Sequence, residues 1–185
     1  MNNVDRLCSS AKSAGMFARE YFDYLRKVLD SIDVESVDKL VQMFEEARLG
    51  DNTIFVAGNG GSATTATTMA NDMGSDILRK CSGDRPFRMF ALTDNVSMMT
   101  AIANDVGYEN IFLNQLKIHY RQGDKLLAIS ASGNSPNVVK AAEWVKEKEG
   151  HVISFVGFGG GRLKEISDVV IHAITEAGEY GPVED

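Results

Sequence analysis

Apolar side chains in the first 50 residues recur every three or four positions, the spacing that places them on one face of a helix. One such run covers about residues 4–29, and a second covers about residues 34–49. Gly50 follows the second run, and glycine is a common residue directly after a helix. The pattern predicts two amphipathic helices, an N-terminal helix pair, ahead of the first strand.

Beyond residue 50 the apolar pattern changes to short continuous runs that alternate with helical stretches. Short apolar runs are typical of strands buried on both faces, and helices between them indicate parallel connections. We therefore expect an α/β fold with a five-stranded parallel sheet covered by helices on both faces. The predicted strands are residues 53–57, 87–92, 125–129, 152–156 and 169–174, and a helix is predicted over about residues 63–73.

The length of 185 residues suits one hydrophobic core, and no repeat, low-complexity tract or linker divides the chain. We expect a single domain in which residues 1–50 form the helix pair and residues 51–185 the α/β core. No apolar run approaches the roughly 20 residues of a membrane span, and the start does not have the pattern of a signal peptide. Cys8 and Cys81 have no metal-site spacing. These features predict a cytoplasmic protein with reduced thiols and no membrane contact.

The net charge of -7 argues against nucleic acid as a partner, because binding to a phosphate backbone depends on clustered Lys and Arg, and no such cluster occurs. A phosphate on a small ligand is not excluded in the same way. Backbone N–H groups and hydroxyls bind such a group without net positive charge. The acidic composition is therefore compatible with a phosphorylated small molecule.

Two loops rich in glycine and hydroxyl groups follow predicted strands. The glycine loop, residues 58–62 (GNGGS), follows the first strand, and the serine loop, residues 130–135 (SASGNS), follows the third. Ser62 and Ser135 are placed to cap the helices that come next, and Pro136 suits the first position of the second of these helices. Ligands of parallel sheets bind beyond the carboxyl ends of the strands. The two loops therefore predict a seat for a phosphorylated sugar.

Neither loop fits a nucleotide motif. The glycine loop lacks the final glycine of the dinucleotide-binding fingerprint, and the chain has no Gly-Lys-Ser or Gly-Lys-Thr of a Walker loop.

Three segments of the chain resemble the SIS (sugar isomerase) domain family and, within it, the phosphoheptose isomerases. They are VAGNGGS at residues 56–62, AIANDVGYENIF at residues 101–112 and GDKLLAISASGNSPNVVKAA at residues 123–142. The resemblance implies a flavodoxin-like sheet and a homotetramer or homodimer with active sites at subunit contacts. It also implies the isomerisation of sedoheptulose 7-phosphate to a D-glycero-D-manno-heptose 7-phosphate through an enediol.

The resemblance further implies which residues contact the sugar phosphate. The family's serine loop has Thr where this chain has Ala131, so one hydroxyl is missing there while the backbone N–H remains. With Ser62 added from the glycine loop, the predicted substrate-binding residues are Asn59, Gly60, Gly61, Ser62, Asn104, Asp105, Ser130, Ala131, Ser132 and Ser135.

An aldose–ketose isomerisation needs a base that moves a proton between adjacent carbons and a group that stabilises the enediolate oxygen. On the helix after the glycine loop, Thr65, Thr68 and Asp72 share one face by their spacing. Asp72 is the carboxylate that we expect nearest the ligand seat. The resemblance makes Asp72 the counterpart of the family's catalytic Glu, and it makes Glu184 the counterpart of a metal-contacting Gln. We therefore predict Asp72 and Glu184 as the catalytic residues.

Zinc is a possible cofactor by the same resemblance, because zinc-binding relatives have His at the position of Thr68. A threonine hydroxyl is a poor zinc ligand, so the metal ligands stay unassigned. The three histidines, His119, His151 and His172, lie outside the motif positions, and we expect them to be structural or exposed. Relatives continue past the position of Asp185 into a helix with a catalytic His, so we expect either a truncated chain or a lost activity.

Two alternatives to a phosphoheptose isomerase remain open. One is a non-catalytic SIS protein that binds a sugar phosphate as a signal or serves as an assembly partner. The other is a different SIS sugar chemistry, such as amino-sugar isomerisation or a lyase step on a sugar ether, because the two loops read the phosphate and hydroxyls rather than the reacting carbon.

Overall fold

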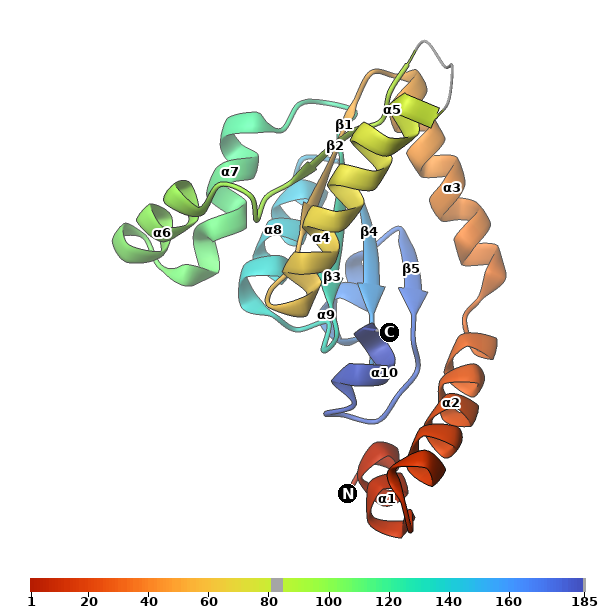
Figure 1. Ribbon diagram of the computed structural model, residues 1–185. Coiled ribbons are helices and arrows are strands. Elements are labelled where there is room, and N and C mark those ends of the chain that lie inside the picture. Colours follow the sequence, from red (N-terminus) through yellow and green to blue (C-terminus); the bar gives the residue numbers. More distant parts are fainter. Residues whose placement is uncertain (81–84, 185) are drawn as a thin grey trace.

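A computed structural model describes residues 1–80 and 85–184 of the chain (Figure 1). The predicted strands are confirmed, with ends that differ by one or two residues. They form one all-parallel sheet in the order β2-β1-β3-β4-β5. This is the flavodoxin-like order that the resemblance implied. The strands are β1 (Thr53–Ala57), β2 (Arg88–Ala91), β3 (Lys125–Ser130), β4 (His151–Val156) and β5 (Val169–His172).

Helices cover both faces of the sheet, as predicted. Side chains alternate along β1, so that Phe55 and Ala57 join the core beneath one set of helices, while Ile54 and Val56 join the core on the opposite face. The first set is α7 (Ile111–His119), α8 (Pro136–Glu147) and α9 (Gly161–Ile166), and the second is α3 (Val34–Leu49) and α4 (Gly61–Asn71). α6 (Val96–Asp105) and the short 3-10 helix η2 (Tyr108–Asn110) contact α7.

Three shorter elements complete the chain. A π-helical turn, η1 (Asp72–Asp76), continues from α4 into α5 (Ile77–Lys80), and α10 (Tyr180–Glu184) lies at the carboxyl end of the described residues. Cys8 is exposed, while Cys81 and Asp185 lie outside the described residues. No helix within residues 1–80 and 85–184 has the length and apolar character needed to cross a membrane.

The prediction of one continuous helix over residues 4–29 is wrong. The chain forms α1 (Asn3–Ser10) and α2 (Ala14–Asp30), with the backbone of Ala11 extended between them. Ser13 is the N-cap of α2, and its hydroxyl accepts a hydrogen bond from the Met16 N–H at 3.2 Å. The break turns α1 back beside α2, at a distance from the sheet (Figure 1). Apolar spacing alone did not reveal it because both helices keep the same periodicity.

Candidate functional site

The glycine and serine loops emerge next to each other because β1 and β3 are neighbours in the parallel sheet. β2 lies on one side of β1, while β4 and β5 continue the sheet beyond β3, so the strand order reverses at this point. Ligands of open α/β sheets bind at such a reversal. The fold therefore brings together the two segments that the sequence singled out.

The amino end of α4 is open. Its N-cap is Gly60, at φ +54°, and no side chain caps the helix. Ser62 is the second residue of α4 and is buried, so the prediction that Ser62 caps this helix is wrong. Backbone N–H groups in the first turn of a helix have no partner within the helix and attract anions. α4 thus presents an uncapped, partly positive end at the glycine loop.

Glu184 lies against this end of α4. A Cβ built on Gly61 would be 2.6 Å from a carboxylate oxygen of Glu184. The contact brings a residue from the carboxyl end of the chain to the glycine loop, about 120 positions away in sequence. Glu184, one of the two predicted catalytic carboxylates, therefore lies at the glycine loop of its own chain.

Asp72 is placed differently. It follows the last residue of α4 and is exposed, and its carboxylate accepts a hydrogen bond from Asn71 at 3.0 Å. Because an α-helix rises about 1.5 Å per residue, Asp72 lies roughly 15 Å along the axis from Ser62. The expectation that Asp72 is the carboxylate nearest the ligand seat is therefore wrong within one chain. Thr65 and Thr68, which were predicted to share a helix face with Asp72, are exposed on α4, while Ala66 is buried in the core.

The serine loop gathers three hydroxyls at the start of α8. Ser130 Oγ lies 2.9 Å from Ser135 Oγ and 3.5 Å from Ser132 Oγ. Ser135 is the N-cap of α8 and Pro136 its first residue, as predicted, but the Ser135 hydroxyl does not cap the helix backbone. The Asn134 N–H donates to Ser132 Oγ at 3.2 Å. The hydroxyls are thus oriented toward one another at a second uncapped helix end.

The turn after β4 is hydrogen-bonded to the serine loop through the backbone. Gly157 N–H donates to the carbonyl of Ala131 at 2.9 Å, and Leu163 N–H donates to that of Gly133 at 3.0 Å. Gly133 has φ +65°, and a Cβ there would lie 1.9 Å from the carbonyl oxygen of Gly160. A Cβ on Gly161 would likewise lie 2.4 Å from the carbonyl oxygen of Ser132. Gly133 and Gly161 are therefore required because the two backbones touch at these positions.

An amide pair joins the glycine loop to the serine-loop helix. Asn59 Nδ2 donates to Asn137 Oδ1 at 2.9 Å, and Asn137 Nδ2 donates to Asn59 Oδ1 at 2.8 Å. The Tyr108 hydroxyl also donates to Asn59 Oδ1 at 3.0 Å. Both lone pairs of this oxygen are then used, so the Asn59 side chain has one N–H left to offer a ligand.

Asn137 and Tyr108 are site residues that sequence reasoning missed. Asn137 follows Pro136, and Tyr108 follows the Asn104-Asp105 pair by three positions, so both lay inside segments that had already been singled out. The side chains of Asn104 and Asp105 are exposed and hydrogen-bonded to each other at 2.7 Å. Tyr108, rather than either of these two, makes the hydrogen bond from this segment to the glycine loop.

The donor set within one chain does not fit zinc. Among residues 1–80 and 85–184, no group of three or more His, Cys, Asp or Glu side chains is arranged to hold a metal ion. Glu184 and Asp72 stand at opposite ends of α4, and Thr68 contributes only a neutral hydroxyl.

The histidines are structural or exposed, as predicted. His119 and His151 are exposed, at the end of α7 and at the start of β4. His172 Nε2 lies 2.9 Å from the carbonyl oxygen of Phe158. The hydrogen-bond partner of His172, Phe158, lies outside the glycine loop and the serine loop.

A cavity of about 260 Å³ adjoins the glycine loop on the α3–α4 side of the sheet. Its polar lining comes from Ser62, Thr65 and Glu184, and the rest of it is mainly apolar. Val28, Leu29 and Ile32, at the end of α2 and just beyond it, close one side. The site therefore has a polar part at the loops and an apolar pocket beside it.

Comparison with known proteins gives a consistent result. A family model for the SIS domain matches residues 20–157. The phosphoheptose isomerase of Rhodospirillum rubrum is 43% identical over 124 residues, which are 67% of this chain and 64% of that protein, slightly less than two thirds. The phosphoheptose isomerase of Azoarcus sp. is 33% identical over 172 residues, which are 91% of this chain and 85% of that protein.

A solved structure has a similar fold over most of the chain. The structure of phosphoheptose isomerase from Neisseria gonorrhoeae superposes with a TM-score of 0.80 at 27% sequence identity. The match covers 93% of this chain and 91% of that one.

Proposed function

Because the chain belongs to the SIS domain family, we propose that it is a sugar-phosphate isomerase of the phosphoheptose type. Its substrate would be sedoheptulose 7-phosphate and its product a D-glycero-D-manno-heptose 7-phosphate. The observation that carries this proposal is the pair of uncapped helix ends, those of α4 and α8, at adjacent strands. Such ends bind anionic and polar groups without a buried cation.

The serine loop is the better seat for the phosphate. Its three hydroxyls, from Ser130, Ser132 and Ser135, lie close together at the amino end of α8. Each of them donates as well as accepts, which suits the acceptor oxygens of a phosphate. Ala131 would contribute its backbone N–H, since it lacks the hydroxyl of the family's Thr.

The glycine loop would then face the sugar. In an aldose–ketose isomerisation a base takes the proton from the carbon next to the carbonyl, and the electron pair moves onto the carbonyl oxygen. The uncapped N–H groups of α4 would stabilise that enediolate oxygen. The hydroxyl proton on the first carbon would then pass to this oxygen, its O–H electron pair would form the new carbonyl, and the base would return its proton to the former carbonyl carbon. Asn59 would offer its remaining N–H to a sugar hydroxyl.

We assign the two carboxylates to different copies of the chain. Glu184 would act at the glycine loop of its own chain, which its carboxylate already touches. Asp72 is too far along α4 to reach the same seat, so it would serve as base in the site of a neighbouring copy. This assignment fits a homotetramer or homodimer with sites at subunit contacts. We place the protein in the cytoplasm as part of the same proposal.

The proposal is tested by offering the purified protein ketose and aldose phosphates of five to seven carbons, with divalent metals supplied, and following interconversion by NMR. We expect turnover of sedoheptulose 7-phosphate, and a loss of at least about 100-fold in kcat for Asp72→Asn. Asp38→Asn on α3, another exposed carboxylate on a helix, is the matched control and should leave kcat unchanged. A protein that converts none of these sugars contradicts the proposed activity.

The second candidate function is sugar-phosphate binding without turnover, as a signal or for assembly. The observation that favours it is Thr68, which stands where zinc-binding relatives have His. Among the described residues, no group of three or more His, Cys, Asp or Glu side chains is arranged to hold a metal ion. Calorimetry distinguishes the two functions. Tight binding without turnover, unchanged by Asp72→Asn, supports this candidate, whereas turnover that is abolished by the same substitution excludes it.

A further inference from the structure

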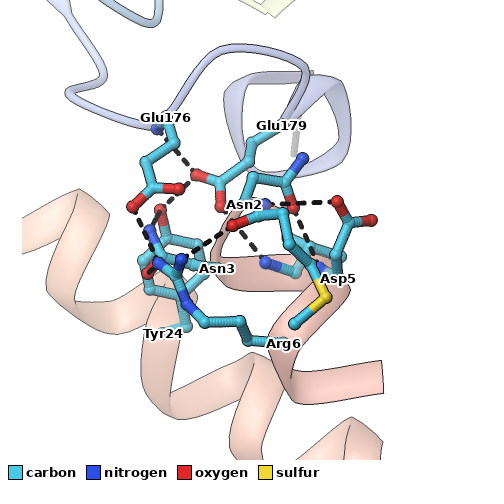
Figure 2. A network of polar contacts seen from close by, with 9 residues as sticks. Asn2, Asn3, Asp5, Arg6, Tyr24, Glu176 and Glu179 are labelled. Atoms are coloured by element: carbon cyan, nitrogen blue, oxygen red, sulfur yellow. Dashed lines mark hydrogen bonds and ion pairs between the residues drawn. The ribbon is translucent and has the colours of Figure 1, made fainter. Parts of the chain in front are cut away.

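One carboxylate that the proposed mechanism does not use is buried. Glu179 is 2% exposed and lies in the segment between β5 and α10. Its carboxylate accepts hydrogen bonds from the Tyr24 hydroxyl at 2.5 Å, the Val4 N–H at 3.1 Å and the Glu176 N–H at 2.8 Å. Figure 2 shows how side chains of α1 and α2 meet this segment. A buried carboxylate with several donors is costly to disturb.

These donors keep Glu179 charged. Burial raises the pKa of the Glu179 carboxyl, but the hydrogen bonds from Tyr24 and from backbone N–H groups outweigh it, so that the pKa is lowered overall. Burial and the same contact raise the pKa of Tyr24 to about 12. Arg6 pairs with Glu176 at 2.7 Å instead, and both of these side chains are about half exposed. The charge-assisted Tyr24–Glu179 bond is therefore a stronger tie to the segment than the exposed Arg6–Glu176 pair.

The segment that Glu179 anchors carries Glu184. α10 begins at the next residue, Tyr180, and has five residues, too few for a stable isolated helix. Two further contacts hold its start: the rings of Phe158 and Tyr180 lie 5.2 Å apart, and the Tyr21 hydroxyl would be 3.1 Å from a Cβ on Gly181. Further along α10, Pro182 is buried and Val183 packs on the turn after β4, where a Cβ on Gly157 would lie 2.4 Å from Val183 Cγ2. Glu179 and the contacts of Tyr180 and Gly181 therefore fix the start of α10, and Pro182 and Val183 pack its remainder.

We propose that Glu179 is a positioning residue for Glu184. By tying α1 and α2 to the start of α10, it holds the Glu184 carboxylate at the amino end of α4. The consequence for catalysis rests on the proposed function, in which Glu184 acts at that end. The positional claim does not depend on turnover, because it concerns only the order of residues 176–184.

Glu179→Gln is the decisive variant, since it keeps the size of the side chain but removes its charge. It also replaces one acceptor oxygen by an NH2 group, which cannot accept a hydrogen bond from the surrounding donors. Hydrogen exchange followed by mass spectrometry should show amides of residues 176–184 exchanging at least about tenfold faster, with amides of α8 unchanged. Tyr24→Phe should produce a smaller change in the same peptide. Arg6→Gln, which breaks the exposed ion pair, is the control and should have little effect. Unchanged exchange of residues 176–184 in Glu179→Gln overturns the proposal.

Kinetics test whether Glu179 acts through Glu184. Glu179→Gln should lower kcat about tenfold or more and leave the KM for the sugar phosphate within about twofold, because the serine loop is untouched. The double variant with Glu184→Ala should be no slower than Glu184→Ala alone. Multiplied losses in the double variant overturn the proposed route through Glu184. If the wild type has no turnover, the proposed function fails, and the exchange measurement still decides the position of α10.

Discussion

At the scale of single residues, the candidate site depends on places where two backbones meet without room for a side chain. Gly133 and Gly160 are the closest such pair, and Gly133 also adopts a positive φ of +65°. An L-residue at such a φ is strained, and its Cβ would overlap the carbonyl of Gly160 as well. The serine loop is therefore shaped by the turn that follows β4 as much as by its own sequence.

The first prediction compares two glycines of these turns. Gly133→Ala should destabilise the protein by about 2–4 kcal/mol, from strain at positive φ together with overlap. Gly159→Ala should cost about 1 kcal/mol or less, because nothing lies within 4 Å of its Cβ and its φ is not positive. Urea unfolding of both variants measures the difference. Equal midpoints would mean that the serine loop and the turn after β4 do not touch.

Site residues that stand in contiguous loops could be predicted from the sequence, while those joined across the fold could not. The glycine and serine loops are visible as motifs, whereas Asn137 and Tyr108 become site residues only through their bonds to Asn59. The capping role of Ser62 was predicted wrongly because Gly60, two positions earlier, is the N-cap and Ser62 already lies within the helix. Hydrogen bonds between residues that are far apart in the sequence leave no local sequence pattern from which they could be predicted.

At the scale of elements, one carboxylate joins α8 to β4. Asp168 accepts hydrogen bonds from Lys146 at 2.6 Å and from the Val152 N–H at 2.8 Å. Its own N–H donates to the carbonyl of Val152 at 2.8 Å. Burial raises the pKa of the Asp168 carboxyl, but the bonds from Lys146 and Val152 outweigh it and hold the pKa below its ordinary value. The charged form is therefore favoured in the folded protein.

The second prediction follows from that sign. A carboxyl whose pKa is lowered on folding contributes stability above its unfolded pKa and loses it as the pH falls through the folded pKa. Asp168→Asn should lower the free energy of unfolding by about 1–2 kcal/mol at pH 7, and the difference should shrink below about pH 3.8. His151, 3.8 Å away, is the other titratable neighbour in the cluster. Urea unfolding of both proteins at several pH values tests this, and a difference independent of pH contradicts it.

The elements were predicted well where burial dictates the pattern. Parallel strands covered on both faces read as continuous apolar runs, which is why all five were located from sequence. The break between α1 and α2 was missed because it depends on the Ser13 cap and the extended Ala11, and neither interrupts the apolar spacing. The five residues of α10 are ordered by Glu179 and by contacts with residues far away in the sequence. The helix propensity of the segment itself does not predict such contacts.

At the scale of the whole molecule, the helices outside the sheet present apolar side chains to solvent. Phe22 and Leu29 on α2 are 61% and 55% exposed, and Val34 and Val41 on α3 are 74% and 61% exposed. Within each pair the two residues are seven positions apart, so they lie on one face of their helix, and exposed apolar faces often mark contacts between proteins. Together with the position of Asp72 far from the loops of its own chain, they support the proposal that a second copy completes each site.

The last prediction tests this shared site by mixing two variants. Asp72→Asn would remove the base, and Ser132→Asp would place a carboxylate where the phosphate should bind. If the base comes from a neighbouring copy, a mixed dimer contains one site with both parts intact, so random reassembly should restore about a quarter of wild-type activity. If each chain supplies its own base, every site in the mixture is damaged and no activity should return. The double variant reassembled with wild type is the matched control: a shared site leaves about a quarter of the activity, and separate sites leave about half.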